Sequence, residues 1–187
     1  MTRAGRVSAD RVFIVVGPSG AGKDTLIDAA RAARPDIRVL RRVITRPEAA
    51  GGEDFEGVSP AEFTRRKAAG DFVLDWQAHG LCYGIPRAGF AGIGPEQCAV
   101  FNGSRAMLAA AKAAFAGLVV IHVTAPLAVL AARLAARGRE APADIVARLE
   151  RAGYDLPADL DCRVVDNGGT RAQGIAGFLA ALQPERG

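Results

Sequence analysis

Histidine, cysteine and lysine are scarce in this chain, and each scarcity excludes a class of site. Only two of the 187 residues are histidines, and neither His79 nor His122 has the sequence context of a hydrolytic triad. The three cysteines are odd in number and show no C-x-x-C spacing. This argues against a disulfide framework and a zinc site, and it favours a reducing, cytoplasmic location.

Long apolar runs are also lacking. Half of the residues are hydrophobic, yet no run approaches the roughly 18 residues of a membrane span. The first ten residues include basic side chains but no apolar segment of the kind that a secretory signal needs. We therefore expect a cytoplasmic protein with no membrane partner, and the length predicts one domain.

Positive charge is carried almost entirely by arginine, with 21 arginines, 3 lysines and a net charge of +4. The arginines are dispersed, with no interleaved aromatic residues and no basic tail, so we expect no nucleic-acid partner. The planar guanidinium group suits bidentate contacts to phosphate. A site for two highly phosphorylated small molecules explains the same bias, although the charge alone does not decide the matter.

The strongest motif is Gly-Pro-Ser-Gly-Ala-Gly-Lys at residues 17–23, which follows the apolar run Val12–Val16. Its glycines let backbone N–H groups turn toward phosphate oxygens, and Lys23 places a charge between the β- and γ-phosphates. The helix-compatible stretch Thr25–Arg34 adds a positive N-terminal end. The motif predicts a P-loop that binds ATP through a set of consecutive residues: Gly17, Pro18, Ser19, Gly20, Ala21, Gly22, Lys23, Asp24 and Thr25.

Asp24 stands where P-loops usually have the serine or threonine that holds Mg²⁺. Its carboxylate is longer and charged. We therefore predict that Asp24 takes the metal-side role through a bound water, with Thr25 as the alternative ligand. The cofactor expected with ATP is Mg²⁺.

Strand and helix signals alternate along the chain, as in a parallel sheet covered on both faces. The predicted strands are Val12–Val16, Ile37–Val43, Ala99–Phe101, Leu118–Val123 and Arg163–Val165. The predicted helices are Thr25–Arg34, Ser104–Phe115, Leu127–Arg137, Ala143–Ala152 and Arg171–Leu182. The fold class expected is α/β, a P-loop NTPase core with a parallel five-stranded sheet covered by helices.

Two segments interrupt this alternation. Residues 45–86 combine a Gly-Gly turn with a short helix and two short strands, predicted at Pro60–Ala69, Phe72–Trp76 and Tyr83–Ile85. Residues 138–142 are predicted to form a short loop flanked by arginines. We expect a single kinase domain over residues 1–187, with its core at about 10–44 and 95–187, an acceptor-binding insertion at about 45–86 and a lid at about 137–145.

Several motifs, in order and spacing, resemble the guanylate kinase family. They are the P-loop, Thr45-Arg46-Pro47, Gly52-Glu53-Asp54-Phe55, Val58-Ser59-Pro60-Ala61-Glu62-Phe63, Gly80-Leu81-Cys82-Tyr83-Gly84, Arg133-Leu134-x-x-Arg137-Gly138-Arg139-Glu140 and Arg148-Leu149. The resemblance implies that Arg46 and Tyr83 hold the acceptor's phosphate. It also implies a lid over the triphosphate, with Lys23, Arg133, Arg137 and Arg148 catalytic and Arg139 on the nucleotide. For any one arginine, a solvated helix face is the alternative.

The departures from that family concern the acceptor's base. Leu74 stands nearest to the acidic residue that reads guanine, Ile85 replaces a hydroxyl residue, and Asn102 replaces an aspartate facing the nucleoside. The second arginine of the Thr-Arg-x-x-Arg pattern is absent. A base facing Leu74 and Ile85 would lose hydrogen bonds, at about 1–3 kcal/mol for each unpaired group. Such a pocket suits a phosphorylated sugar better than a nucleotide.

A closer resemblance is to the ribose 1,5-bisphosphate phosphokinase family of bacterial phosphonate catabolism. It rests on Gly-Lys-Asp, Arg-Arg-Val-Ile-Thr-Arg-Pro, Gly-Gly-Glu-Asp, Trp-x-Ala-His-Gly-Leu-x-Tyr-Gly and Asn-Gly-Ser-Arg. This resemblance implies transfer from ATP to ribose 1,5-bisphosphate, which gives 5-phosphoribosyl 1-diphosphate and ADP. Arg42 is a candidate for the sugar's second phosphate, with a surface role as the alternative, and Arg105 is a further candidate. Asn102 is expected on the acceptor side.

A phosphate monoester acceptor is already ionised at neutral pH, because its second pKa is about 6. Transfer then needs positioning and charge neutralisation rather than a catalytic base.

Two other functions stay open: a guanylate or other nucleoside-monophosphate kinase, and an inactive guanylate-kinase-like binding module. The intact P-loop and the arginine-bearing lid disfavour the module. The partners expected are ATP and a phosphorylated sugar, and the protein is expected to be a monomer or a homodimer. His122 is expected to be a core or strand-end residue, whereas the roles of Glu53, Asp54, Asp75 and His79 are undecided.

Overall fold

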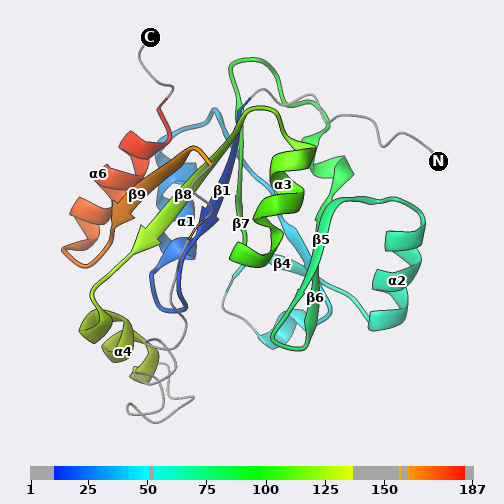
Figure 1. Ribbon diagram of the computed structural model, residues 1–187, viewed down its shortest axis with the longest axis horizontal. Helices are drawn as coiled ribbons and strands as arrows, with labels where there is room; N and C mark the ends of the chain where they lie inside the picture. Colours follow the sequence, from blue (N-terminus) through cyan, green and yellow to red (C-terminus); the bar gives the residue numbers. More distant parts are fainter. Residues whose placement is uncertain (1–10, 51–52, 137–155, 157–159, 184–187) are drawn as a thin grey trace.

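The computed structural model describes residues 11–50, 53–136, 156 and 160–183 (Figure 1). Its larger sheet has five strands in the order β2-β7-β1-β8-β9, and all neighbouring strands run parallel. These strands are β1 (Val12–Val16), β2 (Ile37–Val39), β7 (Cys98–Asn102), β8 (Leu118–Thr124) and β9 (Cys162–Asp166). The predicted α/β fold with a five-stranded parallel sheet is confirmed.

The central strand β1 is apolar throughout because both of its faces are covered. Alternate side chains point to opposite faces: Phe13 and Val15 belong to the core under two helices, α1 (Lys23–Ala33) and α6 (Arg171–Ala181). Ile14 on the other face joins the core that contains the helix α3 (Leu108–Ala114). Figure 1 shows α1 and α6 on one side of the sheet and α3 on the other.

Two further features shape this half of the molecule. The helix α4 (Leu127–Ala135) follows β8 at the end of the sheet where β1 meets the P-loop. The helix α6 begins with a capping box, in which Thr170 accepts from the backbone N–H of Gln173 and the Gln173 side chain accepts from that of Thr170. None of the described helices is long and apolar enough to cross a membrane.

A second, smaller sheet lies beside the first, with its strands in the order β4-β3-β6-β5. Its strands are β3 (Arg42–Ile44), β4 (Phe55–Gly57), β5 (Phe72–Ala78) and β6 (Leu81–Pro86). The helix α2 (Pro60–Ala68) packs on it through Phe63, whose ring stacks on Phe72 at 4.8 Å between centroids. Three short 3₁₀ helices complete the described part: η1 (Glu48–Ala50), η2 (Arg87–Phe90) and η3 (Arg105–Met107).

One predicted strand was wrong. The stretch Ile37–Val43 is divided between β2, which pairs with β7 in the larger sheet, and β3, which pairs with β4 and β6 in the smaller one. Between them, the Leu40 N–H still donates to the Val100 carbonyl at 2.8 Å, and the Leu40 side chain is buried between the two halves. The chain therefore leaves one sheet for the other after Leu40, a step that no local pattern marks.

Other predicted boundaries shift by smaller amounts. The helix predicted at Ser104–Phe115 is the 3₁₀ turn η3 followed by α3, and β4 was not predicted at all. The predicted core reaches residue 44, although β3 pairs within the smaller sheet. The division into core and insertion stays a prediction. The helix predicted at Ala143–Ala152 and the lid at about 137–145 lie outside the described residues.

Candidate active site

The predicted P-loop turns tightly between β1 and α1. Gly17 and Gly22 have φ angles of 152° and 87°, which favour glycine. A Cβ atom at Gly17 would lie 2.2 Å from the Val123 carbonyl oxygen, and one at Gly22 would lie 2.5 Å from the Asn167 side-chain nitrogen. These glycines are therefore required by close packing of the loop against the strand ends, as well as by its turn.

Lys23 is the first residue of α1, and its side chain folds back over the loop. The ammonium nitrogen Nζ donates to the Gly17 carbonyl at 2.9 Å and to the Pro18 carbonyl at 3.2 Å. These contacts hold the positive charge beside the helix N-terminus, where the peptide dipoles also favour an anion. The arrangement can bind and neutralise phosphate groups.

Two residues from elements distant in the sequence stabilise the P-loop by hydrogen bonds. Asn167, directly after β9, is 7% exposed and donates from Nδ2 to the Ala21 carbonyl at 2.7 Å. Arg133 of α4 donates to the Asn167 carbonyl at 2.8 Å and to the Gly20 carbonyl at 3.4 Å. The predicted lid residue Arg133 thus lies at the P-loop backbone.

Asn167 was missed by sequence reasoning. Its position was the available signal: it is a polar residue at the carboxyl end of the last parallel strand. The carboxyl ends of parallel strands share one edge, where ligands of open α/β sheets bind. The backbone N–H of Asn167 donates at 2.8 Å to the Thr124 carbonyl at the end of β8. This hydrogen bond holds Asn167 at that edge of the sheet.

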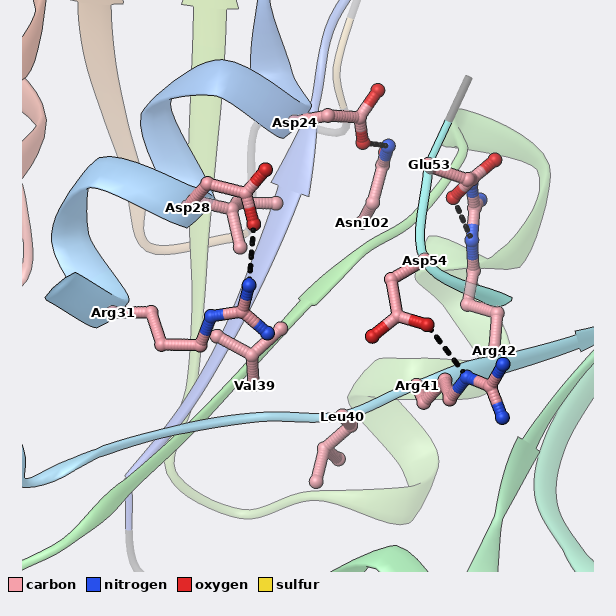
Figure 2. Close-up of a pocket in the computed structure, with 11 residues that line it drawn as sticks. Asp24, Asp28, Arg31, Val39, Leu40, Arg41, Arg42, Glu53, Asp54 and Asn102 are labelled. Carbon is pink, nitrogen blue, oxygen red and sulfur yellow. Dashed lines mark hydrogen bonds and ion pairs between the residues drawn. The ribbon is translucent and has the colours of Figure 1, made fainter. Parts of the chain in front are cut away.

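Asp24 and Asn102 meet at the same edge. Asp24 is on the first turn of α1 and Asn102 ends β7, and the Asn102 amide donates to Asp24 Oδ1 at 2.6 Å. The second carboxylate oxygen of Asp24 points away from Asn102 in Figure 2. The structure thus joins a residue predicted on the nucleotide side to one predicted on the acceptor side.

This pair fits what a magnesium ion requires. Mg²⁺ is held by one or two carboxylates, several waters and substrate phosphates rather than by a closed cage of side chains. Asp24 offers one carboxylate oxygen beyond its bond to Asn102, whereas Thr25 is exposed. In the described part of the chain, no cluster of three or more histidine, cysteine or acidic residues could hold a metal by itself.

A cleft separates the P-loop side from the smaller sheet (Figure 2). One wall is formed by α1 and Asn102, and the other by the start of β3 and the segment that precedes β4. Its lining residues are Asp24, Ile27, Asp28, Arg31, Val39, Leu40, Arg41, Arg42, Glu53, Asp54 and Asn102. A substrate in this cleft would lie between the two sheets, beside Asp24.

Three of the predicted acceptor residues, Arg42, Arg46 and Tyr83, cluster around Glu53, and of these three Arg42 lines the cleft. Arg42 is 8% exposed, so the surface role considered for it is wrong. Its guanidinium lies over the Tyr83 ring, 5.4 Å from the centroid, and its Nε donates to Glu53 Oε2 at 3.0 Å. Arg46 lies over the Phe55 ring at 4.4 Å and reaches Glu53 Oε1 at 3.9 Å. Two positive groups and a phenol thus meet around one carboxylate.

Tyr83 is kept neutral in this setting. Burial raises the pKa of its hydroxyl above the ordinary value, while the nearby Arg42 and Arg46 act in the opposite direction. The Tyr83 ring also stacks on Trp76, with 5.2 Å between centroids and 9° between planes. At neutral pH the hydroxyl therefore keeps its proton and can donate a hydrogen bond to a phosphate oxygen.

Leu74 and Ile85 are paired across β5 and β6, and both are buried, at 5% and 0% exposed. They belong to the apolar core shared with Phe101 and Met107. Neither side chain offers a hydrogen-bond partner to a nucleobase. The neighbouring Asp75 forms an ion pair with Lys67 of α2, which holds its carboxylate toward α2.

The remaining predicted residues are less informative. His79 and Gly80, both at positive φ, form the exposed two-residue turn between β5 and β6. His122 is half-buried in β8, and burial together with the Lys23 charge lowers its pKa. Arg105 is exposed in η3 and is not among the residues that line the cleft. Arg137, Arg139 and Arg148 lie outside the described residues.

Comparison with known proteins gives relatives over nearly the whole chain. The sequence is 44% identical over 179 residues to the ribose 1,5-bisphosphate phosphokinase PhnN of Agrobacterium fabrum, covering 94% of this chain and 98% of that protein. It is 47% identical over 182 residues to the protein of the same name from a Ruegeria species, covering 94% of this chain and 93% of the other. No family model matches the chain.

A second kind of relative is longer. The chain is 48% identical over 172 residues to a bifunctional ribose 1,5-bisphosphokinase-thymidine phosphorylase of Cupriavidus necator, covering 91% of this chain. It spans only 29% of the length of that relative. The similarity therefore concerns one part of the bifunctional protein.

Solved structures resemble this fold at low sequence identity. A guanylate kinase from Anaplasma phagocytophilum matches with a TM-score of 0.61 at 18% identity, covering 94% of this chain and 87% of the other. A gluconokinase from Sinorhizobium meliloti matches with a TM-score of 0.54 at 20% identity, covering 95% and 93% of the two chains. The fold is therefore that of the guanylate kinase-like P-loop kinases.

Proposed function

The chain belongs to the ribose 1,5-bisphosphate phosphokinase family, and we propose that it transfers the γ-phosphoryl group of ATP to ribose 1,5-bisphosphate. The products would be 5-phosphoribosyl 1-diphosphate and ADP, in phosphonate degradation. The observation that carries this proposal is the cluster of Arg42, Arg46 and Tyr83 around Glu53 at the edge of the cleft, whose side chains are of the kind that binds phosphate. The apolar Leu74 and Ile85, against which Tyr83 packs, offer no hydrogen-bond partner to a base.

On the nucleotide side, Lys23 would neutralise the migrating phosphoryl group while the loop binds the β-phosphate. Asp24 would hold Mg²⁺ through a water, and the ion would supply charge neutralisation at the β- and γ-phosphates. The Asn102 amide fixes one oxygen of that carboxylate. Arg133 is proposed as catalytic, together with Arg137, Arg148 and the nucleotide-binding Arg139.

On the acceptor side, an oxygen of the phosphate at C1 would attack the γ-phosphorus. The bond from that phosphorus to the β–γ bridging oxygen breaks, and ADP leaves with the electron pair. The attacking oxygen is already ionised at neutral pH, because the second pKa of a phosphate monoester is about 6. No side chain has to remove a proton, which agrees with the exposed position of His79 and the strand position of His122.

A guanylate kinase-like acceptor is the second candidate, because the fold resembles that enzyme and the groups proposed for phosphate binding are present. GMP would have to place its guanine edge near buried, apolar Leu74 and Ile85. We therefore expect GMP to be a poorer acceptor than ribose 1,5-bisphosphate by about 100-fold or more in kcat/KM, because its polar edge loses hydrogen bonds.

The discriminating experiment measures ADP release with ribose 1,5-bisphosphate, GMP and other monophosphates side by side. Rapid turnover of the sugar bisphosphate alone supports the proposal. Equal or faster turnover of GMP would indicate a nucleoside-monophosphate kinase. If none of these acceptors leads to ADP release, the proposed function is wrong.

Replacing Asp24 with alanine tests the metal-side role. We expect the Mg²⁺ concentration for half-maximal rate to rise about tenfold or more, because losing a carboxylate that holds the ion through water weakens its binding. The measurement is the rate as a function of Mg²⁺ at fixed ATP. The matched control is Glu62→Ala, an acidic residue of α2 outside the cleft lining whose carboxylate pairs with Arg65 at 2.8 Å. An unchanged Mg²⁺ dependence in Asp24→Ala would place Asp24 away from the metal.

The cytoplasmic location, the monomeric or homodimeric state, and the absence of membrane and nucleic-acid partners stay parts of the proposal. The three cysteines are free thiols, which supports a reducing environment.

A further inference from the structure

Glu53 lies between the two arginines proposed to bind the acceptor. Its Oε2 atom accepts from Nε and from a terminal nitrogen of Arg42, and its Oε1 atom is 3.9 Å from a terminal nitrogen of Arg46. One carboxylate therefore spans both guanidinium groups with both of its oxygens. A phosphate group offers oxygens of the same charge and similar spacing to such a pair.

The positions of the two guanidinium groups do not depend on Glu53 alone. Arg42 is held over the Tyr83 ring and Arg46 over the Phe55 ring, at 5.4 Å and 4.4 Å from the centroids. Cation–π contacts of this kind stabilise a guanidinium in place. The rings would keep both guanidinium groups in place if the carboxylate moved away.

Burial distinguishes Glu53 from the neighbouring Asp54. The side chains of Arg42 and Glu53 are 10% and 16% exposed, whereas those of Arg41 and Asp54 are 51% and 64% exposed. Solvent screens the exposed pair strongly and the buried pair much less. A phosphate beside Arg42 would therefore meet strong repulsion from Glu53.

The charges of the cleft lining make the same point. Arg31, Arg41 and Arg42 line it, against four carboxylates, those of Asp24, Asp28, Glu53 and Asp54. Each of these arginines is paired with a carboxylate (Figure 2). In this arrangement each lining arginine is already neutralised by a carboxylate, which disfavours an acceptor with two phosphates unless a carboxylate withdraws.

We propose that Glu53 occupies the acceptor-phosphate position between Arg42 and Arg46 and is displaced when the acceptor binds. This inference rests on the proposed function, since it takes both arginines as ligands of the acceptor's phosphate. Displacement requires an anion whose attraction to the arginines exceeds that of the tethered carboxylate. A sugar with a second phosphate anchored elsewhere meets that requirement, whereas a free monophosphate meets it poorly. Glu53 is thus a specificity-determining residue.

Glu53→Gln tests this role, because glutamine keeps the size and one acceptor oxygen but removes the charge. The probe is inorganic phosphate, titrated by calorimetry into protein whose P-loop is saturated with Mg²⁺ and a non-hydrolysable ATP analogue. We expect the dissociation constant for phosphate to fall about tenfold, the scale of one charge-assisted contact. The KM for ribose 1,5-bisphosphate should also fall in this variant.

Two controls separate this effect from a general change in charge. Glu56→Gln removes a carboxylate of β4 that does not line the cleft and that pairs with Arg66, and it should leave the affinity for phosphate within about twofold, since screened charges contribute little. The double variant Arg42→Ala/Glu53→Gln should lose the gain, because the guanidinium that receives the phosphate is gone. Glu53→Ala provides a second charge-free variant, and thermal unfolding shows that each variant is folded.

The direction in which the affinity for phosphate changes in the Glu53 variants decides whether the inference holds. An unchanged or weaker affinity for phosphate in both folded Glu53 variants would mean that the carboxylate aligns the arginines and is not displaced, and it would overturn the proposal. Because phosphate binding is measured without turnover, this result is independent of the acceptor assay. Failure of ribose 1,5-bisphosphate as a substrate would contradict the proposed function, while the phosphate titration would still test Glu53.

Discussion

Replacing Lys23 with alanine is expected to reduce phosphoryl transfer by about a thousandfold or more while the protein stays folded. The ammonium group is held at the P-loop by the Gly17 and Pro18 carbonyls, where a triphosphate would lie. In phosphoryl transfer, catalysis depends on positioning and on neutralising charge, so removing a group that touches the migrating phosphoryl affects kcat directly. The fold should survive, because Lys23 is only partly buried and its ammonium group donates to carbonyls of the P-loop itself.

The measurement is kcat with ribose 1,5-bisphosphate, combined with thermal unfolding of the variant. Lys67→Ala is the matched control, because that lysine is exposed on α2 and pairs with Asp75, far from the P-loop in the sequence. It should retain near-normal activity. Turnover of Lys23→Ala within tenfold of the unaltered protein would remove the assignment of the P-loop as the catalytic phosphate site.

Arg46→Ala is expected to lower kcat/KM for the sugar bisphosphate about 100-fold or more. Losing one guanidinium from the acceptor site would leave a phosphate dianion under-neutralised, and such losses are large in closed sites. Arg46 lies over Phe55 and reaches Glu53, which lines the side of the cleft opposite α1. The affinity for ATP should therefore change little.

Separate titrations of acceptor and ATP distinguish a local effect from a general one. Arg65→Ala serves as the control, since Arg65 is exposed on α2 and pairs with Glu62 in the same helix, at 2.8 Å. It should behave as the unaltered protein does. Equal losses in acceptor and ATP affinity for Arg46→Ala would show that Arg46 supports the fold rather than the acceptor.

The parts of the fold that could be predicted from sequence are those with a local cause. Val12–Val16 is an uninterrupted apolar run, and it forms the central strand β1 with both faces buried. The glycine and lysine spacing after it requires a tight turn into a helix, and α1 begins at Lys23. In these segments the pattern of side chains and the backbone requirement agree, so neighbouring elements could not override them.

The features that were not predicted depend on contacts between distant segments. The break between β2 and β3 follows from Leu40, which is buried between the two halves, yet residues 37–43 read as one strand. Asn167 is needed because the P-loop backbone at Ala21 lies against it. Neither partner is visible in the local sequence.

The sequence proposed residues for the candidate site but did not predict how they are arranged. The sequence indicated Arg42, Arg46 and Tyr83 as acceptor residues, and in the structure these three residues lie around the Glu53 carboxylate. It did not indicate that Glu53 would lie between the two arginines, because that pairing joins β3 to the segment before β4 across a turn. The contact between Asp24 and Asn102 likewise joins α1 to β7, which are far apart in the chain.

The identity of the product tests the central claim most directly. Phosphorus NMR can follow ribose 1,5-bisphosphate with ATP, Mg²⁺ and the purified protein. The account predicts loss of the phosphate signal at C1, a new pair of coupled diphosphate signals on the sugar, and an equal amount of ADP. An unchanged sugar bisphosphate, whether ATP stays intact or is only hydrolysed to ADP and inorganic phosphate, would contradict it.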